Sequence, residues 1–532
     1  MFVRIKRGGN EKHPHDYLQL VESYRDQGQP KHRIIANLGR LDRLIESGQI
    51  EGLVSSLSRF SREARVLSAS RVNGCRAQLW GPALVFGRLW ERQGIPEILA
   101  RLSERRRFGF EVERAAFALA LQRLCVPGSD LAGSRWLKTV EAPGFGPLAL
   151  QHLYRAVGFL AEARAELERE LFYRDRDLFN QELDLVFVDT TSLYVYREAE
   201  TALRRRGYSR DRRPELPQVV LCVAVDRAGW PVAWEALPGN TADVRALEAV
   251  VEVLRERFRI GRAVVVADSG MVSARAIEHL SGDRDAPFSY IFGCRLRRER
   301  EVRDEVLGDG GQFERADKGL EVKQVVVAGR RYVVCRNPEE AERDRVAREA
   351  IVAQLEARLS RGPKALVGNR GYRRYLRVRG EALSLDEAAI AAEERLDGIF
   401  VLRTDTDLPA AEVARAYKSL WRVERTFREV KSTLASRPIY HQRDENCVGH
   451  IVASFLALRL EVDLLRRLRE RRVEVSWPAL MHDLSQVQAV RLDMDGASWL
   501  VRTDLQGSAH AAFKAAGVRP PCRVTPLEGK EM

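Results

Sequence analysis

Hydrophobic and polar residues alternate along the first 60 residues and then change to a helical spacing. The short runs FVRIK, DYLQLVESYR and HRIIANLG predict strands, and a helix is expected from about Leu41 to Phe60. From residue 66 to 180, apolar residues recur at the spacing of helices. We therefore expect a small N-terminal α+β unit at 1–65 and a helical domain at 66–180. Both are basic, so either could dock on a DNA duplex or serve only in packing.

Beyond the helical region, the apolar runs have the length of strands. The run LDLVFVDTTSLYVY (183–196) is followed by runs at 219–226 and 230–239, which together predict three antiparallel strands. A helix, a strand that ends at Asp268, a second helix and a fifth strand follow. This order is that of a ribonuclease-H-like α/β fold with a mixed five-stranded sheet. In that arrangement Asp189, in the first run, and Asp268 become near neighbours.

The remaining segments interrupt and complete this α/β core. Residues 297–396 contain β-rich runs around one predicted helix, and we interpret them as an insertion. The core would therefore have two parts, at 181–296 and 397–470. The C-terminal region at 471–532 contains a strand or two and a helix, and its sequence does not indicate a role.

The stretch YKSLWRVERTFREVK (417–431) has no Gly or Pro and predicts one helix. At helical spacing, one apolar stripe consists of Leu420, Val423, Phe427, Val430 and Leu434. A second, narrower face carries Tyr417, Trp421, Glu424, Arg428 and Lys431. Such a face would hold a metal-binding Glu near a polyanion. The alternative is a surface helix with ion pairs, such as Glu424 with Arg428.

Two aspartates lie within or at the end of apolar strand runs. A carboxylate such as Asp189 is costly to bury unless it is paired or binds a metal, and the alternative is a strand-end Asp that caps a turn. Asp268 ends a strand, where sites collect in open α/β sheets; it could instead cap a helix, unless Ser269 or Ser273 does so. Together with Glu424, the two aspartates could hold two divalent ions, and oxygen-only ligands predict Mg²⁺ or Mn²⁺.

The charge balance favours a polyanionic partner. Lys and Arg number 88 against 75 acidic residues, a net charge of +13, and Arg outnumbers Lys. The guanidinium group of Arg binds phosphate through two hydrogen bonds, so nucleic acid is the first partner to consider. An Arg-rich protein from a GC-rich genome would show the same excess of basic residues. The seven cysteines are scattered without a CxxC pair, which fits a reducing compartment. We expect no signal peptide and no membrane span, and predict a cytoplasmic, nucleoid-associated protein.

A set of motifs runs in order along nearly the whole chain: YLQLVESYR, IANLGRLD, VFVDTTS, GYSRDRRPELPQ, PGNTAD, VVVADSGM, YKSLWRVERTFREVK, RPIYHQ and GHIVASFLALRL. This ordered set resembles the bacterial insertion-sequence transposases of the DDE class, in the branch with a Tyr/Arg/Glu/Lys signature helix and a β-strand insertion domain. The resemblance implies a metal-binding triad of Asp189, Asp268 and Glu424. It also implies that Tyr417 and Lys431 contact the phosphates of the transposon end.

One position departs from the pattern of that family. The signature has an Arg three residues after the Tyr, and here this position is Leu420, so Arg422 or Arg428 would have to take over the phosphate contact. Relatives that form DNA hairpins use an aromatic residue of the insertion to hold a flipped base. The insertion has no Trp, and its stacking candidates are Tyr332, Tyr372, Tyr375 and Phe313. Hairpin formation therefore stays open.

These patterns and the resemblance predict a transposase that binds terminal inverted repeats, cuts its element's ends with two Mg²⁺ or Mn²⁺ ions and joins 3′ hydroxyls to target DNA. The residues expected to contact double-stranded DNA are Tyr417, Trp421, Arg428, Lys431, Arg210 and Arg212. The loop that carries Arg210 and Arg212 could equally be a solvated loop. Because two ends must be held together, a homodimer on DNA is expected. The alternatives are a hydrolysis-only nuclease of the same fold and a catalytically inactive DNA-binding descendant.

Overall fold

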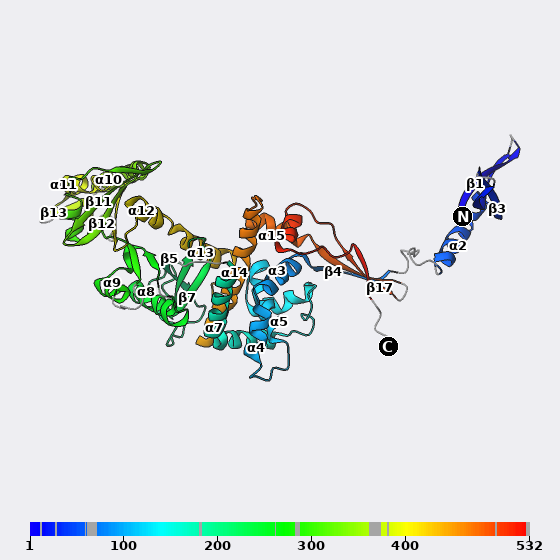
Figure 1. Ribbon diagram of the computed structural model, residues 1–532, viewed down its shortest axis with the longest axis horizontal. Coiled ribbons are helices and arrows are strands. Elements are labelled where there is room, and N and C mark those ends of the chain that lie inside the picture. The colour runs from blue at the N-terminus through cyan, green and yellow to red at the C-terminus, as the bar shows by residue number, and fades with distance from the viewer. Residues whose placement is uncertain are drawn as a thin grey trace. The chain divides into compact units, whose positions relative to one another are not determined.

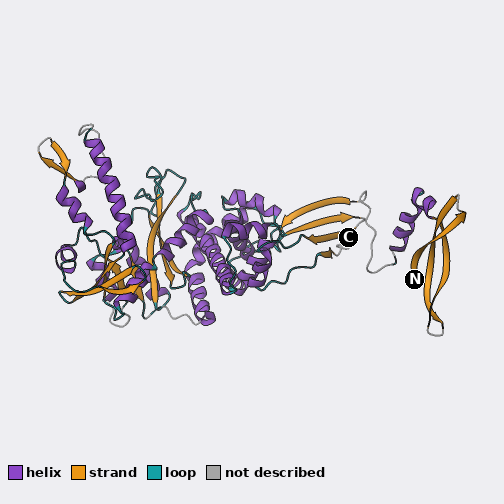
Figure 2. Cartoon of the chain, turned by 90° about the horizontal axis from the view of Figure 1, so that it is seen from above, coloured by secondary structure: helices purple, strands orange, loops and turns teal. Residues whose placement is uncertain are grey.

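The structure is a computed structural model, and it describes residues 1–10, 13–26, 29–58, 60, 72–179, 184–260, 262–281, 288–360, 374–379, 382–494 and 497–527 (Figures 1 and 2). The chain divides into two compact units. The first comprises Met1–Ala77, Val490–Val501 and Cys522–Met532, and the second comprises Gln78–Ala489 and Arg502–Pro521.

The N-terminal segment of the first unit forms a three-stranded antiparallel sheet, as its alternating pattern predicted. Its strands pair in the order β1 (Phe2–Asn10), β2 (His13–Asp26) and β3 (Gln29–Arg40). The single helix expected after them is instead two, α1 (Leu41–Glu46) and α2 (Gln49–Ser58). Gly48 separates them with a φ of +66°, a left-handed conformation that ends a helix. Residues 27 and 28 of the expected turn lie outside the described residues.

A second sheet of the first unit joins distant parts of the chain. Its strands lie in the order β18 (Val524–Leu527), β17 (Ala497–Arg502), β16 (Gln488–Met494) and β4 (Val72–Leu79). Strand β4 corrects the expectation that residues 66–180 are helical throughout. Its partner β16 lies more than 400 residues later, so no local pattern could have indicated the pairing.

The second unit contains a helical bundle built around one buried helix. Its helices are α3 (Gly81–Arg92), α4 (Ile95–Ser103), α5 (Val112–Cys125), α6 (Asp130–Trp136), α7 (Leu150–Phe179), α14 (Asp444–Glu470), α15 (Trp477–Ser485) and α16 (Ala509–Ala516). α14 packs against α3, α5, α7 and α16 (Figure 1). Its buried Arg459 donates two hydrogen bonds, each 2.9 Å, to the carboxylate of Asp175 on α7. This paired charge offsets the cost of desolvation inside the bundle.

The same unit contains a nine-stranded mixed sheet. Its order is β10 (Glu314–Asp317), β11 (Leu320–Val327), β12 (Arg330–Arg336), β15 (Ile399–Thr404), β9 (Ser289–Gly293), β8 (Val264–Ala267), β5 (Leu185–Tyr194), β6 (Gln218–Asp226) and β7 (Pro231–Pro238). β5, β6 and β7 are antiparallel neighbours, and β8 and β9 run parallel to β5. The five strands expected from the apolar runs are present in the expected order. The sheet is larger than expected because β15, β12, β11 and β10 extend it from β9.

Each face of the central strands is covered by different helices. Val186 and Val188 of β5 share a core with α8 (Asp243–Glu252) and α9 (Ala274–Ser281). Phe187 and Leu193 point to the opposite face and share a core with α14 and with the segment that carries Glu424. Since side chains alternate along a strand, Asp189 belongs to the second face. The period of the strand therefore directs this carboxylate towards the helical side on which Glu424 lies.

The segment 297–396 contributes strands to the main sheet and helices outside it. The predicted helix from Glu339 is α10 (Pro338–Leu359), which begins where the Asn337 side chain accepts hydrogen bonds from the backbone N–H of Glu339 and Glu340. A hairpin of β13 (Leu376–Arg379) and β14 (Ala382–Leu385) precedes α11 (Glu387–Glu394). The turn expected at Gly380 lies outside the described residues. Of the described helices, none combines the length and apolar character needed to span a bilayer.

Candidate active site

Asp189 and Asp268 occupy equivalent positions on neighbouring parallel strands. Val188 of β5 pairs with Ala267 of β8, and Asp189 and Asp268 directly follow these two residues in the sequence. Asp189 lies inside β5, which continues to Tyr194, so it does not cap a turn at a strand end. The sheet therefore brings two carboxylates, 79 residues apart in sequence, to one place on its surface.

The Asp189 carboxylate is largely buried and has few donors. It accepts a hydrogen bond of 2.7 Å from the backbone N–H of Thr190, and the Arg210 guanidinium lies 3.9 Å away. Burial raises the pKa of Asp189 to about 6; the carboxylates of Asp268 and Asp243 also raise it, whereas the Thr190 hydrogen bond and Arg210 lower it. The protein thus holds a desolvated carboxylate among like charges, an environment that a bound cation would relieve.

Arg210 and Asp243 form a polar link beside Asp189. Arg210 donates hydrogen bonds to the carbonyl oxygen of Thr190 and, at 2.8 Å, to its hydroxyl. That hydroxyl donates at 2.6 Å to Asp243, the first residue of α8, and Arg210 lies 3.7 Å from the same carboxylate. Ala242 is the N-cap of α8. Asp243 was not among the residues expected at the site, although it stands in the PGNTAD motif.

Asp268 is held by a tyrosine from the other side of the cleft. The hydroxyl of Tyr417 donates a 2.9 Å hydrogen bond to Asp268 Oδ1. Helix α9 is capped instead by Ser273, whose hydroxyl accepts from the backbone N–H of Ala276, as one of the sequence alternatives allowed. Burial, followed by the Asp268 carboxylate, raises the pKa of Tyr417 well above its usual value, so the phenol remains a donor. A Cβ at Gly293 would collide with the Tyr417 hydroxyl, so a glycine is needed at that position of β9.

The helix expected at 417–431 is broken into three pieces. They are α12 (Ala410–Lys418), α13 (Trp421–Arg428) and the π-helical turn η8 (Glu429–Thr433). At the first break, Ser419 Oγ donates 3.0 Å to the carbonyl of Arg415, and Leu420 N donates to Tyr417 O in a tighter turn. Such back-bonding by serine bends helices and competes with the regular ladder. Of the expected narrow face, Tyr417, Trp421 and Glu424 still line one cleft, whereas Arg428 and Lys431 do not.

The apolar stripe of this segment packs as expected. Val423, Phe427, Val430 and Leu434 are buried in the same core as α14, while Leu420 is partly buried. Glu424, Trp421 and Arg428 are exposed on the other side. A cleft of about 610 Å³ is lined by Asp189, Arg210, Asp268, Glu340, Phe400, Tyr417, Lys418, Leu420, Trp421, Val423 and Glu424. The three carboxylates singled out from the sequence thus line one cleft; Arg428 is not among its lining residues.

Lys431 and Arg212 differ in their surroundings. Lys431 Nζ donates at 3.1 Å to Asp211, a buried carboxylate that also lies 3.3 Å from Arg437. Burial lowers the pKa of Lys431, and Asp211 opposes this shift. Lys431 is therefore paired within the protein, by a residue that the sequence analysis did not single out. Arg212 is exposed, in a turn where its own φ is +58°.

The carboxylate oxygens in the cleft fit the ligand preference of Mg²⁺. The raised pKa of Asp189 beside Asp268 and Asp243 is a further sign that a cation would be favoured there. Nevertheless, across the described ranges no three Asp, Glu, His or Cys side chains lie close enough together to hold a metal ion. The donor chemistry fits a divalent cation, while Glu424 shares the cleft without completing a compact cluster.

The aromatic residues considered for base stacking are mostly covered. Tyr332 and Tyr375 are buried, at 1% and 2% exposure. Phe313 is partly buried between Lys323 and Arg336, which lie 5.4 and 4.5 Å from its ring centroid. Tyr372 lies outside the described residues. Of the three described candidates, Tyr332 and Tyr375 are too buried to stack on a flipped base, and Phe313 is partly buried.

Two protein-family models match the chain. Residues 3–70 match the IS1634 family transposase N-terminal domain, and residues 180–460 match the transposase DDE domain. The second match contains Asp189, Asp268 and Glu424. Among solved structures, the chain is similar to a piggyBac transposase in a synaptic complex with hairpin DNA, with 11% identity and a TM-score of 0.39, over 76% of this chain and 79% of that chain. No curated protein matches the chain.

Proposed function

Since the chain belongs to the DDE transposase family, we propose that it cuts DNA at the ends of its own mobile element and joins the exposed 3′ hydroxyls to target DNA. The observation that carries this proposal is the register of β5 and β8, which aligns Asp189 with Asp268 in a cleft that Glu424 also lines. The strand order β7-β6-β5-β8-β9 supports a ribonuclease-H-like core for this site.

Asp189 and Asp268 are the residues that would hold the metal ions, and Glu424 would complete the set. When bound, two Mg²⁺ ions would activate an attacking oxygen and stabilise the leaving 3′ oxygen at phosphorus. Tyr417 fixes the orientation of Asp268 through its hydroxyl. Arg210 holds the backbone of Thr190 beside Asp189, so the carboxylate keeps its position before substrate arrives.

The DNA strand would enter along the exposed side of α13. Trp421 is 49% exposed and lines the cleft, so its ring can stack on a base. Arg428 and Arg212 are exposed cations that can meet backbone phosphates outside the cleft. Lys431 would reach a phosphate only by exchanging its partner Asp211. Joining two element ends requires two active sites, so a homodimer on DNA is part of the proposal.

The test compares wild-type protein with Asp189→Ala on DNA that carries the element's ends. Inverted repeats that bracket the reading frame in the genome would supply these ends. We expect cleavage to fall by about a thousandfold or more, because the metal site contributes several kcal/mol, while binding to the ends persists. Asp304→Ala, an exposed aspartate paired with Arg303, is the matched control and should cleave normally. Unchanged cleavage by Asp189→Ala would remove the mechanism.

The second half of the reaction is tested with pre-cut ends and a target plasmid. Wild-type protein should join the 3′ hydroxyls to the plasmid in Mg²⁺. Cleavage without joining would identify a nuclease. Binding with neither step would identify an inactive DNA-binding descendant.

A further inference from the structure

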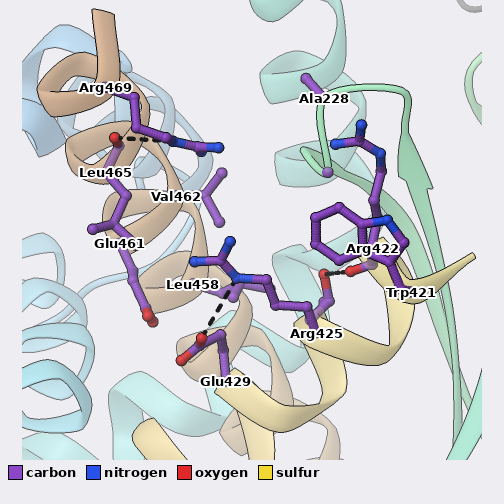
Figure 3. Close-up of a pocket in the computed structure, with 12 residues that line it drawn as sticks. Ala228, Trp421, Arg422, Arg425, Glu429, Leu458, Glu461, Val462, Leu465 and Arg469 are labelled. Carbon is purple, nitrogen blue, oxygen red and sulfur yellow. Dashed lines mark hydrogen bonds and ion pairs between the residues drawn. The ribbon is translucent and has the colours of Figure 1, made fainter. Parts of the chain in front are cut away.

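A second hollow, distinct from the catalytic cleft, is also lined by Trp421. Its walls come from α13, α14 and the Ala228–Gly229 turn between β6 and β7 (Figure 3). Arginines project into it from both helices: Arg422 and Arg425 from α13, and Arg469 from α14. We call this hollow the arginine pocket. The sequence analysis assigned no role to it.

The arginines of the pocket are incompletely neutralised. Arg425 lies 3.8 Å from Glu429, longer than a close ion pair. Arg469 donates at 3.3 Å to the carbonyl of Leu465, and the buried Nε of Arg422 has no hydrogen-bond partner within the described part of the chain. Burial lowers the pKa of Arg469, and so do the charges of Arg425 and Arg422. The three guanidinium groups therefore repel one another, and an anion between them would relieve the repulsion.

The pocket also contains two carboxyl groups, those of Glu429 and Glu461, against its three arginines. Glu461 is buried and lies beside Glu429 (Figure 3). Burial, followed by the charge of Glu429, raises the pKa of Glu461 well above its ordinary value. The surroundings of Glu461 therefore disfavour its charged form. Three arginines against two carboxyl groups leave the arginine pocket positive.

Trp421 connects the arginine pocket to the catalytic cleft. It lines both, and the guanidinium of Arg422 lies 5.0 Å from its ring centroid. A DNA strand that leaves the cleft past the Trp421 ring would therefore meet the arginine pocket next. Exposed aromatic rings next to arginines are typical of surfaces that follow a nucleic-acid strand.

We propose that the arginine pocket binds a backbone phosphate of the DNA strand that passes through the catalytic cleft. Arg422, Arg425 and Arg469 contact the phosphate, and Trp421 stacks on a base between the pocket and the cleft. The proposal rests on the proposed function, because it assigns the strand in the pocket to the substrate of the cleft. It names a phosphodiester of DNA as the ligand.

The test measures DNA binding by the full chain without divalent metal, so it does not depend on cleavage. Wild-type protein and the variants Arg422→Gln, Arg425→Gln and Arg469→Gln are titrated onto a short fluorescent DNA duplex of arbitrary sequence at several salt concentrations. Each variant should bind more weakly, and the slope of log affinity against log salt should fall by about 1 per lost phosphate contact. Arg345→Gln is the matched control, because Arg345 lies on α10 and is paired with Glu342 and Glu349. This variant should have the wild-type salt slope.

Glu429→Gln separates a phosphate site from a structural role. Removing the charge of Glu429 should tighten DNA binding, whereas loss of a merely structural ion pair would not. Thermal unfolding of each variant shows whether it is folded. Unchanged salt slopes in all three folded arginine variants would overturn the proposal. Inorganic phosphate that stabilises the wild type but not Arg425→Gln, with unchanged DNA slopes, would identify a site for free anions and would also overturn it.

The outcomes of the two proposals can be told apart. Asp189→Ala should retain the wild-type salt slope, since it acts on cleavage. If Asp189→Ala still cleaves and the arginine variants show a reduced salt slope of DNA binding, the proposed mechanism fails and the phosphate site stands. If Asp189→Ala abolishes cleavage and the arginine variants keep the slope, the phosphate site fails alone.

Discussion

The cleft is built from two regions that are organised in different ways. One, the strand side, consists of β5 and β8 with Asp189 and Asp268. The other, the helix side, is the segment 410–433 with Glu424. On the strand side, neighbouring hydrogen bonds fix the register, and hence the positions of both carboxylates. On the helix side, the turn at Ser419–Leu420 and the change to π-helical spacing at Glu429 place Tyr417, Glu424 and Lys431 on different pieces.

This difference shows where the site is preorganised and where it can adjust. Asp189 is largely buried and Asp268 is held by Tyr417, whereas Glu424 is exposed at the start of a short helix. The polar contacts that tie the helix side to the rest include Tyr417 to Asp268, Lys431 to Asp211 and Arg415 to the carbonyl oxygen of Ala316. We therefore expect the strand side to determine where metal binds and the helix side to complete the site when DNA is present.

The largest expected effect tests whether the exposed glutamate is part of the site at all. Glu424→Gln should lower cleavage by about a thousandfold, because the site loses a charged metal ligand that acts in the transition state. Binding to DNA should persist. The measurement is the single-turnover cleavage rate in Mg²⁺. Glu412→Gln, an exposed glutamate on α12, should cleave at the wild-type rate.

A small effect of Glu424→Gln would contradict the proposed contribution of the helix side to the metal site. It would mean that the helix side supplies no ligand and that the strand side works with another carboxylate, such as Asp243, whose charge acts on Asp189. In that case Asp243→Asn, and not Glu424→Gln, would abolish cleavage.

The strand side could be predicted from sequence because local patterns determine it. The apolar runs gave the five central strands in their order, and the two-residue period of β5 places Asp189 on the face that α14 covers. The buried stripe at Val423, Phe427 and Val430 was likewise predicted from spacing. The domain boundaries and the roles of the site residues stay predictions.

The helix side could not be predicted in detail, since its breaks depend on contacts that spacing does not reveal. Ser419 can continue a helix or hydrogen-bond to the preceding turn, and the residues around it do not indicate which of the two occurs. The pairing of Lys431 with Asp211 joins residues 220 positions apart. The extension of the sheet by β12 and β15 is also long-range pairing, which β-rich runs alone do not specify.

A second prediction concerns the contact that ties the helix side to the loop before β6. Asp211→Asn leaves Lys431 and Arg437 without their shared carboxylate in a site where the Asp211 and Lys431 side chains are 8% and 11% exposed. We expect the free energy of unfolding to fall by about 3 kcal/mol, because a buried cation loses its partner. Chemical denaturation measures this change.

The control for this stability change is Asp304→Asn. Asp304 and Arg303 form an exposed pair, and exposed pairs contribute little, so its denaturation midpoint should match the wild type. If Asp211→Asn unfolds like the wild type, the helix side is not anchored by this contact. The loop and the segment 410–433 would then move independently, and the pairing of Lys431 with Asp211 would not hold the helix side in place.

The smallest expected effect restores the signature arginine on the helix side. Leu420 is half-buried, lines the cleft and stands where the family pattern has an Arg. Leu420→Arg should add one phosphate contact, so DNA binding should tighten severalfold and the salt slope should steepen by about 0.9. Fluorescence anisotropy across salt concentrations measures both. Val326→Arg, on a 61% exposed side chain of β11, adds the same charge outside the cleft and serves as the control.

The two substitutions together distinguish a local contact from a general increase in charge. If Leu420→Arg steepens the slope and Val326→Arg does not, phosphates pass directly over the break between α12 and α13. Equal changes would mean that the added charge acts at long range. No change from Leu420→Arg would mean that the strand avoids this break, and that phosphate binding on the helix side begins only beyond Trp421, at the arginine pocket.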